Sequence, residues 1–187
     1  MITGGSSVDF DTKRQKRDHY RSVNHAALTG TVVQTKWSHV PLTFDARDVD
    51  LRSAPHADAM VINCRVAGWD LHKVLVDNGS QADIIFLHAF DHMGISHSLL
   101  KPADNPLHRF DSKGTFTVGK IELPLAFGAA PNARNEQVTF NIVDMVYPYN
   151  AIMGHGSINK FEAAIHGLYL CMKILGPQGV ITVYGDQ

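Results

Sequence analysis

Long apolar segments and an excess of charge of one sign are both missing from this sequence of 187 residues. No run approaches the ~18 apolar residues that a membrane-spanning helix needs, and the chain does not open with the apolar core of a secretory signal. The formal net charge is −1, so no overall field attracts nucleic acid or an anionic membrane surface. We therefore expect no membrane partner and an intracellular, cytoplasmic location. The 44% hydrophobic and 19% charged residues are typical of one globular domain.

Cysteine is scarce as well, because the chain contains only Cys64 and Cys171, far apart in the sequence. Each lies inside an apolar, alternating segment, where a free thiol behaves as a small buried hydrophobe. The sequence therefore predicts two core thiols.

The residue patterns of common metal and phosphate sites are incomplete. His88 and His92 have the helical spacing of a zinc site and His97 lies nearby in the sequence. However, Ala89 stands where a zinc protease carries its glutamate base. The "GHG" at residues 154–156 lacks the Lys-Ser/Thr pair of a phosphate-binding loop. We expect neither a metal ion nor a cofactor.

Apolar periodicity is missing from residues 1 to about 36, which include the basic cluster "KRQKRDHYR" at 13–21. A segment with so little to bury is predicted to be a polar, partly basic linker. Nucleic acid is expected as a partner only through this leader. The rest of the chain, 37–187, is predicted to form one domain with its core at about 58–175.

Beyond the leader, the apolar residues recur with a period of two, which is typical of half-buried strands. In "MVINCRV" they fall on one face, Ala67 and Gly68 turn the chain, and "WDLHKVLV" returns as the second strand of a hairpin. Further alternation is found at residues 121–127, 138–142 and 168–174. Only 81–93 and 157–165 look helical, so we predict an all-β domain with one or two short helices.

The stretch "HKVLVDNGSQADIIF", residues 72–86, admits three interpretations. Asn78-Gly79 between apolar runs is a strong hairpin signal, and Asn78-Gly79-Ser80 has the form of a glycosylation site. Asp77, at a strand end before a glycine, is a candidate catalytic acid. The segment after Ser80 lacks the alternation of a returning strand, and no secretory signal supports glycosylation. The catalytic hypothesis therefore gains weight.

A similar local pattern occurs twice, about 75 residues apart. An apolar run ends in a glycine and a short helical segment follows, first at 75–79 and again at 151–154. Glycine permits a tight turn at each place. The second glycine loop, Ile152, Met153 and Gly154, carries no acid, so one chain supplies one such carboxylate.

The order of these segments resembles that of the retropepsin-like aspartic proteases. The matching parts are the hairpin, "LVDNGS", a short helix, "GKIELPLAFG", "YNAIMG" and a second short helix. The sequence is most similar to the protease segment of plant gypsy-type LTR retrotransposon gag-pol polyproteins, from about Leu42 to the end of the chain. The resemblance implies an acid-protease barrel, a peptide endohydrolase activity on a polyprotein or peptide, and a homodimer. It also implies a piece of a longer polyprotein, located in a virus-like particle if the element is active.

Peptide hydrolysis of this kind needs two carboxylates that share one proton. One deprotonates the attacking water, and the protonated one polarises the carbonyl group. Because the sequence contains one Asp-x-Gly-Ser, the second Asp77 must come from another copy across a two-fold axis. Around Asp77 the resemblance places the active-site loop Asn78, Gly79 and Ser80. It places the flap that covers substrate at Phe110, Asp111, Ser112, Lys113 and Gly114, with Gly114 as its hinge.

Four residues, at three places in the sequence, depart from the family pattern. Asn78 stands where retropepsins carry Thr or Ser, whose hydroxyl bridges the two subunits, and His155 stands where Arg is common. Asp111 and Ser112 stand at the flap tip, where related elements tend to carry glycine. An alternative hypothesis is therefore a catalytically decayed module that dimerises or binds peptide, with Asp77 as a turn-capping carboxylate.

Overall fold

The computed structural model describes residues 40–49, 58–103 and 117–186. The chain divides into two units, Met1–Thr35 and Lys36–Gln187, and the described residues belong to the second. The basic leader and the flap segment 110–114 lie outside the described residues. No helix in the described part of the chain is long and apolar enough to cross a membrane.

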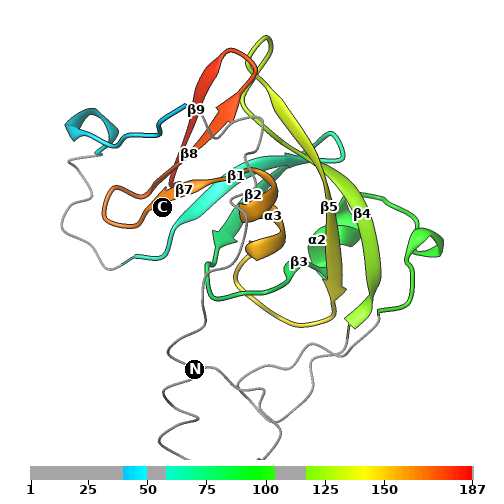
Figure 1. Cartoon of the computed structure of the whole chain (residues 1–187). Helices are drawn as coiled ribbons and strands as arrows, with labels where there is room; N and C mark the ends of the chain where they lie inside the picture. Colours follow the sequence, from blue (N-terminus) through cyan, green and yellow to red (C-terminus); the bar gives the residue numbers. More distant parts are fainter. Residues whose placement is uncertain (1–39, 50–57, 104–116, 187) are drawn as a thin grey trace, which may run out of the picture. The chain divides into compact units, whose positions relative to one another are not determined.

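Strands dominate the described residues, as the period-two pattern predicts. Six of them close a barrel: β1 Val61–Val66, β2 Trp69–Val76, β3 Asp83–Phe86, β4 Thr117–Phe127, β5 Arg134–Val143 and β6 Ala151–Met153. Three more form a second sheet: β7 Ala164–His166, β8 Cys171–Gly176 and β9 Gly179–Tyr184. The short helical segments are η1 Ala46–Asp48, α2 Leu87–His92, η2 His97–Leu99 and α3 His155–Lys160. The predicted all-β barrel with short helices is confirmed (Figure 1).

The β1–β2 hairpin forms where the alternation predicts it. Its two turn residues, Ala67 and Gly68, have φ angles of 50° and 85°, and positive φ at both central positions is the geometry of the tight turn that suits twisted strands. The pairing register shifts by one residue between Ile62 and Cys64, and Lys73 on β2 takes up a φ of 55° close to this bulge.

The barrel order, β1-β2-β6-β3-β5-β4, joins segments that are far apart in the sequence. β2 and β6 pair in parallel, with Val76 opposite Met153. Because parallel partners end at the same edge, the residues that follow them, Asp77 and Gly154, lie at one place. The two glycine loops of the sequence are thereby brought together.

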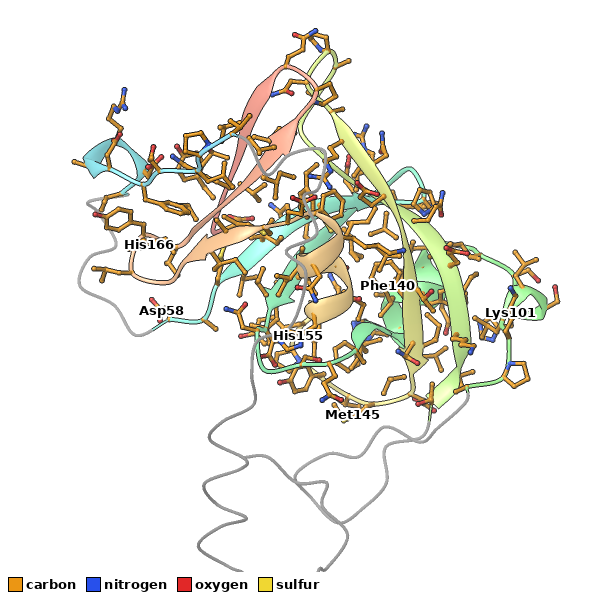
Figure 2. All side chains as sticks on the ribbon, viewed as in Figure 1. Asp58, Lys101, Phe140, Met145, His155 and His166 are labelled. Atoms are coloured by element: carbon orange, nitrogen blue, oxygen red, sulfur yellow. The ribbon has the colours of Figure 1, made fainter. Side chains whose placement is uncertain are left out.

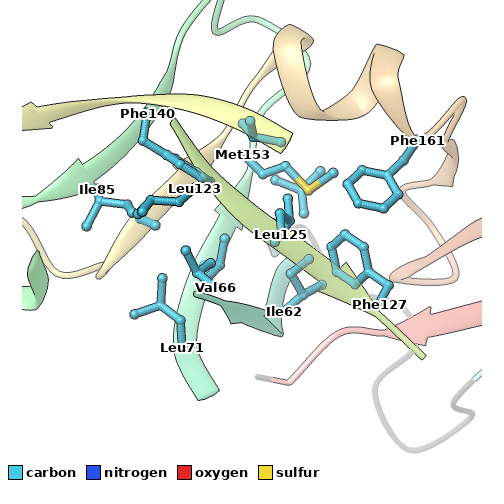
Figure 3. Close-up of a cluster of buried hydrophobic side chains, with 14 of the residues drawn as sticks. Ile62, Val66, Leu71, Ile85, Leu123, Leu125, Phe127, Phe140, Met153 and Phe161 are labelled. Atoms are coloured by element: carbon cyan, nitrogen blue, oxygen red, sulfur yellow. The ribbon is translucent and has the colours of Figure 1, made fainter. Parts of the chain in front are cut away.

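The inside of the barrel is filled with apolar side chains (Figure 3). At one end Phe127 packs edge-to-face against Phe161, with ring centroids 5.0 Å apart. A cavity of about 10 Å³ lies among residues that include Val66, Leu125 and Phe140, barely the room that one water molecule occupies. The barrel therefore acts as a packed core rather than a ligand container.

Both predicted helices are shorter than the sequence pattern suggested. In the first segment, 81–93, Asp83–Phe86 is strand β3, which pairs with β5 on one side and β6 on the other. The isoleucines and the phenylalanine of this segment suit a strand that pairs with both β5 and β6. This pairing outweighs the helix preference of the local sequence. The second helix begins two residues before the predicted 157–165 and ends at Lys160. It stops there because Glu162 has a φ of 49°, in the left-handed region.

The last predicted strand, 168–174, begins three residues late. Residues 167–170 form a turn in which Leu170 has a φ of 46°, and Leu168 is exposed. β8 starts at Cys171 and lies between β7 and β9. In the part of the chain that the structure describes, β9 pairs with β8 alone, so its outer edge lacks a strand partner.

Residues 40–49 pack against this C-terminal sheet. The ammonium group of Lys173, on β8, donates to the Thr43 carbonyl at 2.8 Å and lies 2.7 Å from an Asp48 carboxylate oxygen. The Phe44 ring lies 5.2 Å from Lys173 Nζ and 5.2 Å from the His166 ring, which Figure 2 labels. We call residues 40–49 the N-terminal strap.

Candidate active site

Asp77 begins a tight turn directly after β2. The Ser80 amide donates to the Asp77 carbonyl at 3.1 Å, and the Gly79 amide donates to Asp77 Oδ1 at 2.8 Å. The Asp77 side chain is half-buried, while Asn78 and Gly79 are exposed. The turn therefore holds one carboxylate oxygen by a backbone N–H and presents the carboxylate at the surface of the chain. Asn78-Gly79 does not form a hairpin, because the segment after Ser80 joins β5 and β6 rather than β2.

The space around Gly79 is tight on the side of the Asp77 carboxylate. A Cβ atom built there would lie 3.2 Å from Asp77 Oδ1, and the φ of Gly79 is outside the left-handed region. A side chain at this position would therefore require the Asp77 carboxylate to shift by a few tenths of an ångström, whereas the φ angle places no such demand.

The second glycine loop holds the active-site loop from the side. The Asp77 amide donates to the Met153 carbonyl at 3.0 Å, and the His155 amide donates to the Ser80 carbonyl at 2.9 Å. The His155 side chain adds a third bond, from Nε2 to the Asn78 carbonyl at 2.5 Å. The structure thus brings the predicted residues 77–80 and 152–154 into one cluster.

Gly154 makes this contact possible. A Cβ atom at this position would meet the Ala82 carbonyl oxygen at 2.5 Å and the Ser80 carbonyl oxygen at 2.8 Å. Ser80 turns its hydroxyl away from the catalytic candidate, since Oγ donates to the Ala82 carbonyl at 2.7 Å. Both loops are consequently locked together mainly through their backbones.

Asp83 is a residue of the site that the sequence did not reveal. It is buried, with 3% of its surface exposed, and its carboxylate accepts from the Gly154 amide at 2.8 Å and the Ser157 amide at 3.0 Å. Burial raises the pKa of Asp83, and the donors at Ser157 and Gly154 oppose the rise. Asp83 is predicted as a helix residue from local pattern, so the sequence held no signal for its contact with α3.

The three histidines that suggested zinc do not converge. His88 Nε2 contacts the Asn150 side chain at 3.0 Å, His92 Nδ1 contacts the His88 carbonyl at 2.6 Å, and His97 Nε2 contacts an Asp91 carboxylate oxygen at 2.7 Å. Among the described residues, no group of three or more His, Cys, Asp or Glu side chains is arranged to hold a metal ion.

The two thiols are free, with Cys171 buried and Cys64 half-buried. Burial raises the pKa of the Cys64 thiol to about 12 and also raises the pKa of Cys171. A thiol with a raised pKa is a poor nucleophile at neutral pH. Neither cysteine is therefore a candidate for nucleophilic catalysis.

A surface hollow of about 440 Å³ lies between α2 and the β5–β6 loop. Its walls include Leu87 and Met145, with Asp91 and Asp144 at its polar side. Neither this hollow nor the small cavity inside the barrel is lined by a residue of the active-site loop. Asp77 therefore lies outside these two hollows.

Comparison with solved structures finds a similar fold in a retroviral protease-like domain. The retroviral protease-like domain of Ddi1 from Leishmania major matches with a TM-score of 0.53 and 16% sequence identity, over 71% of this chain and 97% of that chain. A retropepsin-like aspartic protease from Rickettsia conorii matches with a TM-score of 0.41 and 13% identity, over 68% of this chain and 83% of that chain. No protein-family model and no curated protein sequence matches this chain. The chain has a retropepsin-like fold.

Proposed function

We propose that the chain is an aspartic endopeptidase whose active site combines Asp77 from two copies. The observation that carries the proposal is the arrangement of Asp77 itself: a half-buried carboxylate, held at Oδ1 by the Gly79 amide, at the shared end of the parallel strands β2 and β6. A carboxylate fixed by the backbone but open to one side can approach a second carboxylate, and such a pair holds one proton between them.

The chemistry needs two acids, and each chain brings one at this turn. In the proposed homodimer one Asp77 deprotonates water and the other, protonated, polarises the scissile carbonyl. The flap at 110–114 would cover the peptide. The sequence resemblance supports a retrotransposon gag-pol polyprotein as the natural substrate, and with it a cytoplasmic or virus-like-particle setting.

The direct test is cleavage of casein and of a polyprotein-derived peptide library at about pH 5, with and without a statine-type inhibitor. Asp77→Asn keeps the shape of the turn and removes the ionisable group, so cleavage should fall by at least about a thousandfold while the fold and the dimer persist. Activity of Asp77→Asn within about tenfold of the unmodified chain would remove Asp77 from the mechanism.

A chain that dimerises and binds peptide but never cleaves would support the decayed module instead. Cleavage separates the two hypotheses, and binding of the statine inhibitor, measured by calorimetry, shows whether the site has assembled in a chain that does not cleave.

A further inference from the structure

The peptide group between Asn78 and Gly79 is held at both ends. Its N–H, on Gly79, donates to Asp77 Oδ1 at 2.8 Å, and its carbonyl, on Asn78, accepts from His155 Nε2 at 2.5 Å. Because a peptide group is planar and rigid, fixing the carbonyl also fixes the direction of the N–H. His155 therefore acts on the Asp77 carboxylate through one intervening peptide plane.

The bond to the carbonyl also fixes which nitrogen of His155 carries a proton. A carbonyl oxygen only accepts, so Nε2 must be the donor. His155 is exposed and lies in the first turn of α3 (Figure 2). Because the His155 side chain is exposed, it adds little to the apolar core, and its contact with the Asn78 carbonyl is the role that the structure indicates.

Asp83 fixes the backbone on both sides of His155. The buried Asp83 carboxylate accepts the Gly154 and Ser157 amides, one on each side of His155 in the sequence. Gly156 completes the fit, because a Cβ atom at this position would collide with Asp83 Oδ2. These contacts fix the start of α3, and the His155 ring reaches from there to the carbonyl of Asn78 in the active-site loop.

We propose that His155 is a positioning residue for the Asp77 carboxylate, with Asp83 as its anchor. This proposal rests on the proposed aspartic protease function of the same site. His155 orients the peptide group 78–79 so that the Gly79 N–H points at Oδ1 and leaves the other carboxylate oxygen for the shared proton. Loss of the donor lets this peptide group rotate and lowers the chemical rate more than it weakens substrate binding.

The test compares His155→Phe with His155→Gln. Phenylalanine keeps a planar ring without a donor, whereas the terminal amide of glutamine offers an N–H at about the place of Nε2. His155→Phe should lower kcat about tenfold or more with KM within about threefold, and His155→Gln should recover most of the rate. His92→Phe is the matched control, because it removes another exposed imidazole bound to a backbone carbonyl, on α2.

A second measurement works without activity. Amide hydrogen exchange of Gly79 and Ser80 should accelerate about tenfold or more in His155→Phe, and less in His155→Gln, while the β4 and β5 amides stay unchanged. Asp83→Asn, which replaces one of the two acceptors with a donor, should accelerate exchange at Gly154, Ser157 and Gly79 together.

The outcomes separate the two proposals. If the unmodified chain cleaves no peptide but the exchange pattern appears as described, the protease function fails and the positioning role stands. If the chain cleaves peptide and His155→Phe retains full kcat and unchanged Gly79 exchange, the positioning role is overturned and the protease function stands. Equal loss in His155→Phe and His155→Gln also overturns it, because the donor would then be irrelevant.

Discussion

At the scale of single residues, the backbone and the side chain of Asn78 have different surroundings. Its carbonyl is engaged by His155, while its side chain is exposed and makes no hydrogen bond to another described residue. In a two-fold dimer this side chain would meet its own copy beneath the carboxylate pair, where a Thr or Ser hydroxyl is compact and an amide is longer and planar.

Asn78→Thr should therefore tighten the dimer and raise turnover at fixed protein concentration. Two reciprocal hydroxyl bonds of about 0.5–1.5 kcal/mol each would improve the dimer dissociation constant about tenfold or more. Sedimentation and peptide-cleavage rates on both forms measure the effect. If Asn78→Thr lowers both the dimer affinity and the rate, the Asn side chains form their own matched pair across the axis, and Asn78 is an adapted part of the site.

At the scale of elements, α3 is held at its far end by a buried cation. Arg134, at the start of β5, has 6% of its surface exposed and donates to the Phe161, Leu175 and Lys160 carbonyls and to the Glu136 carboxylate. These bonds join the C-terminal end of α3 to the barrel and to β8. The carbonyls at a helix end need such donors, because the helix itself supplies none.

Arg134→Met should accordingly lower the free energy of unfolding by about 2–4 kcal/mol, since it leaves buried carbonyls unpaired while keeping the apolar stem. Urea denaturation followed by tryptophan fluorescence gives the value. Arg65→Met is the control, because Arg65 makes an exposed ion pair with Asp70 on the β1–β2 hairpin and should change stability by less than about 1 kcal/mol. Equal effects in the two variants would contradict the anchoring role.

The N-terminal strap depends on the pair between Asp48 and Lys173. The pKa of Asp48 is lowered because the Lys173 ammonium group donates to its carboxylate. A pKa lowered in the folded state adds stability above the unfolded value of about 4, and this addition disappears as the pH falls through the lowered folded pKa. The strap should therefore stay docked at neutral pH and loosen in acid.

Asp48→Asn should reproduce the acid effect at neutral pH. Cys171 is buried and lies two residues before Lys173 on β8, so its side chain points to the same face of the strand as that of Lys173. Release of the strap should speed maleimide labelling of Cys171 by about tenfold, while Cys64, on β1, labels at its original rate and serves as the internal control. A parallel rise at both cysteines would mean general unfolding and would count against the strap.

Most strands were predictable from the sequence, and the reason is physical. β1, β2, β4 and β5 each place one face on the core, so apolar and polar residues alternate. β3 does not alternate in this way, because it lies between β5 and β6 and three of its four residues are buried. Its "DIIF" could therefore not be told from the start of a helix.

Part of the site was also predictable, since Asp77 and its turn are local in sequence. Asp83 and Arg134 were not, because their partners are remote: Asp83 binds amides 71 and 74 residues away, and Arg134 binds carbonyls 26 to 41 residues away. A charged side chain is buried only when hydrogen-bond partners surround it, and the sequence does not show which remote residues those partners are. Residues that arrange a site through the backbone of another element leave no signature of their own.

At the scale of the whole molecule, one chain is an incomplete catalyst under the proposed function. Asp77 is open to one side, and the outer edge of β9 lacks a strand partner among the described residues. This edge carries Val180 and Tyr184, both exposed, and no charged residue or proline within Gly179–Tyr184. Edges without such protection readily pair with another chain, and under the proposed function we expect a second copy of this chain to pair at this edge.

Specific activity should then rise with protein concentration and level off above the dimer dissociation constant.

Tyr184→Lys places a like charge on each copy of the edge and should weaken the dimer about tenfold or more, shifting the activity curve to higher concentration without lowering its plateau. Trp69→Lys, at an exposed aromatic of the β1–β2 hairpin, is the control and should leave the curve in place. Sedimentation velocity on the same samples gives the fraction of dimer at each concentration, which can be compared with the specific activity. Activity that is independent of concentration in a proven monomer would contradict a shared active site, because a single chain would then be supplying both acids.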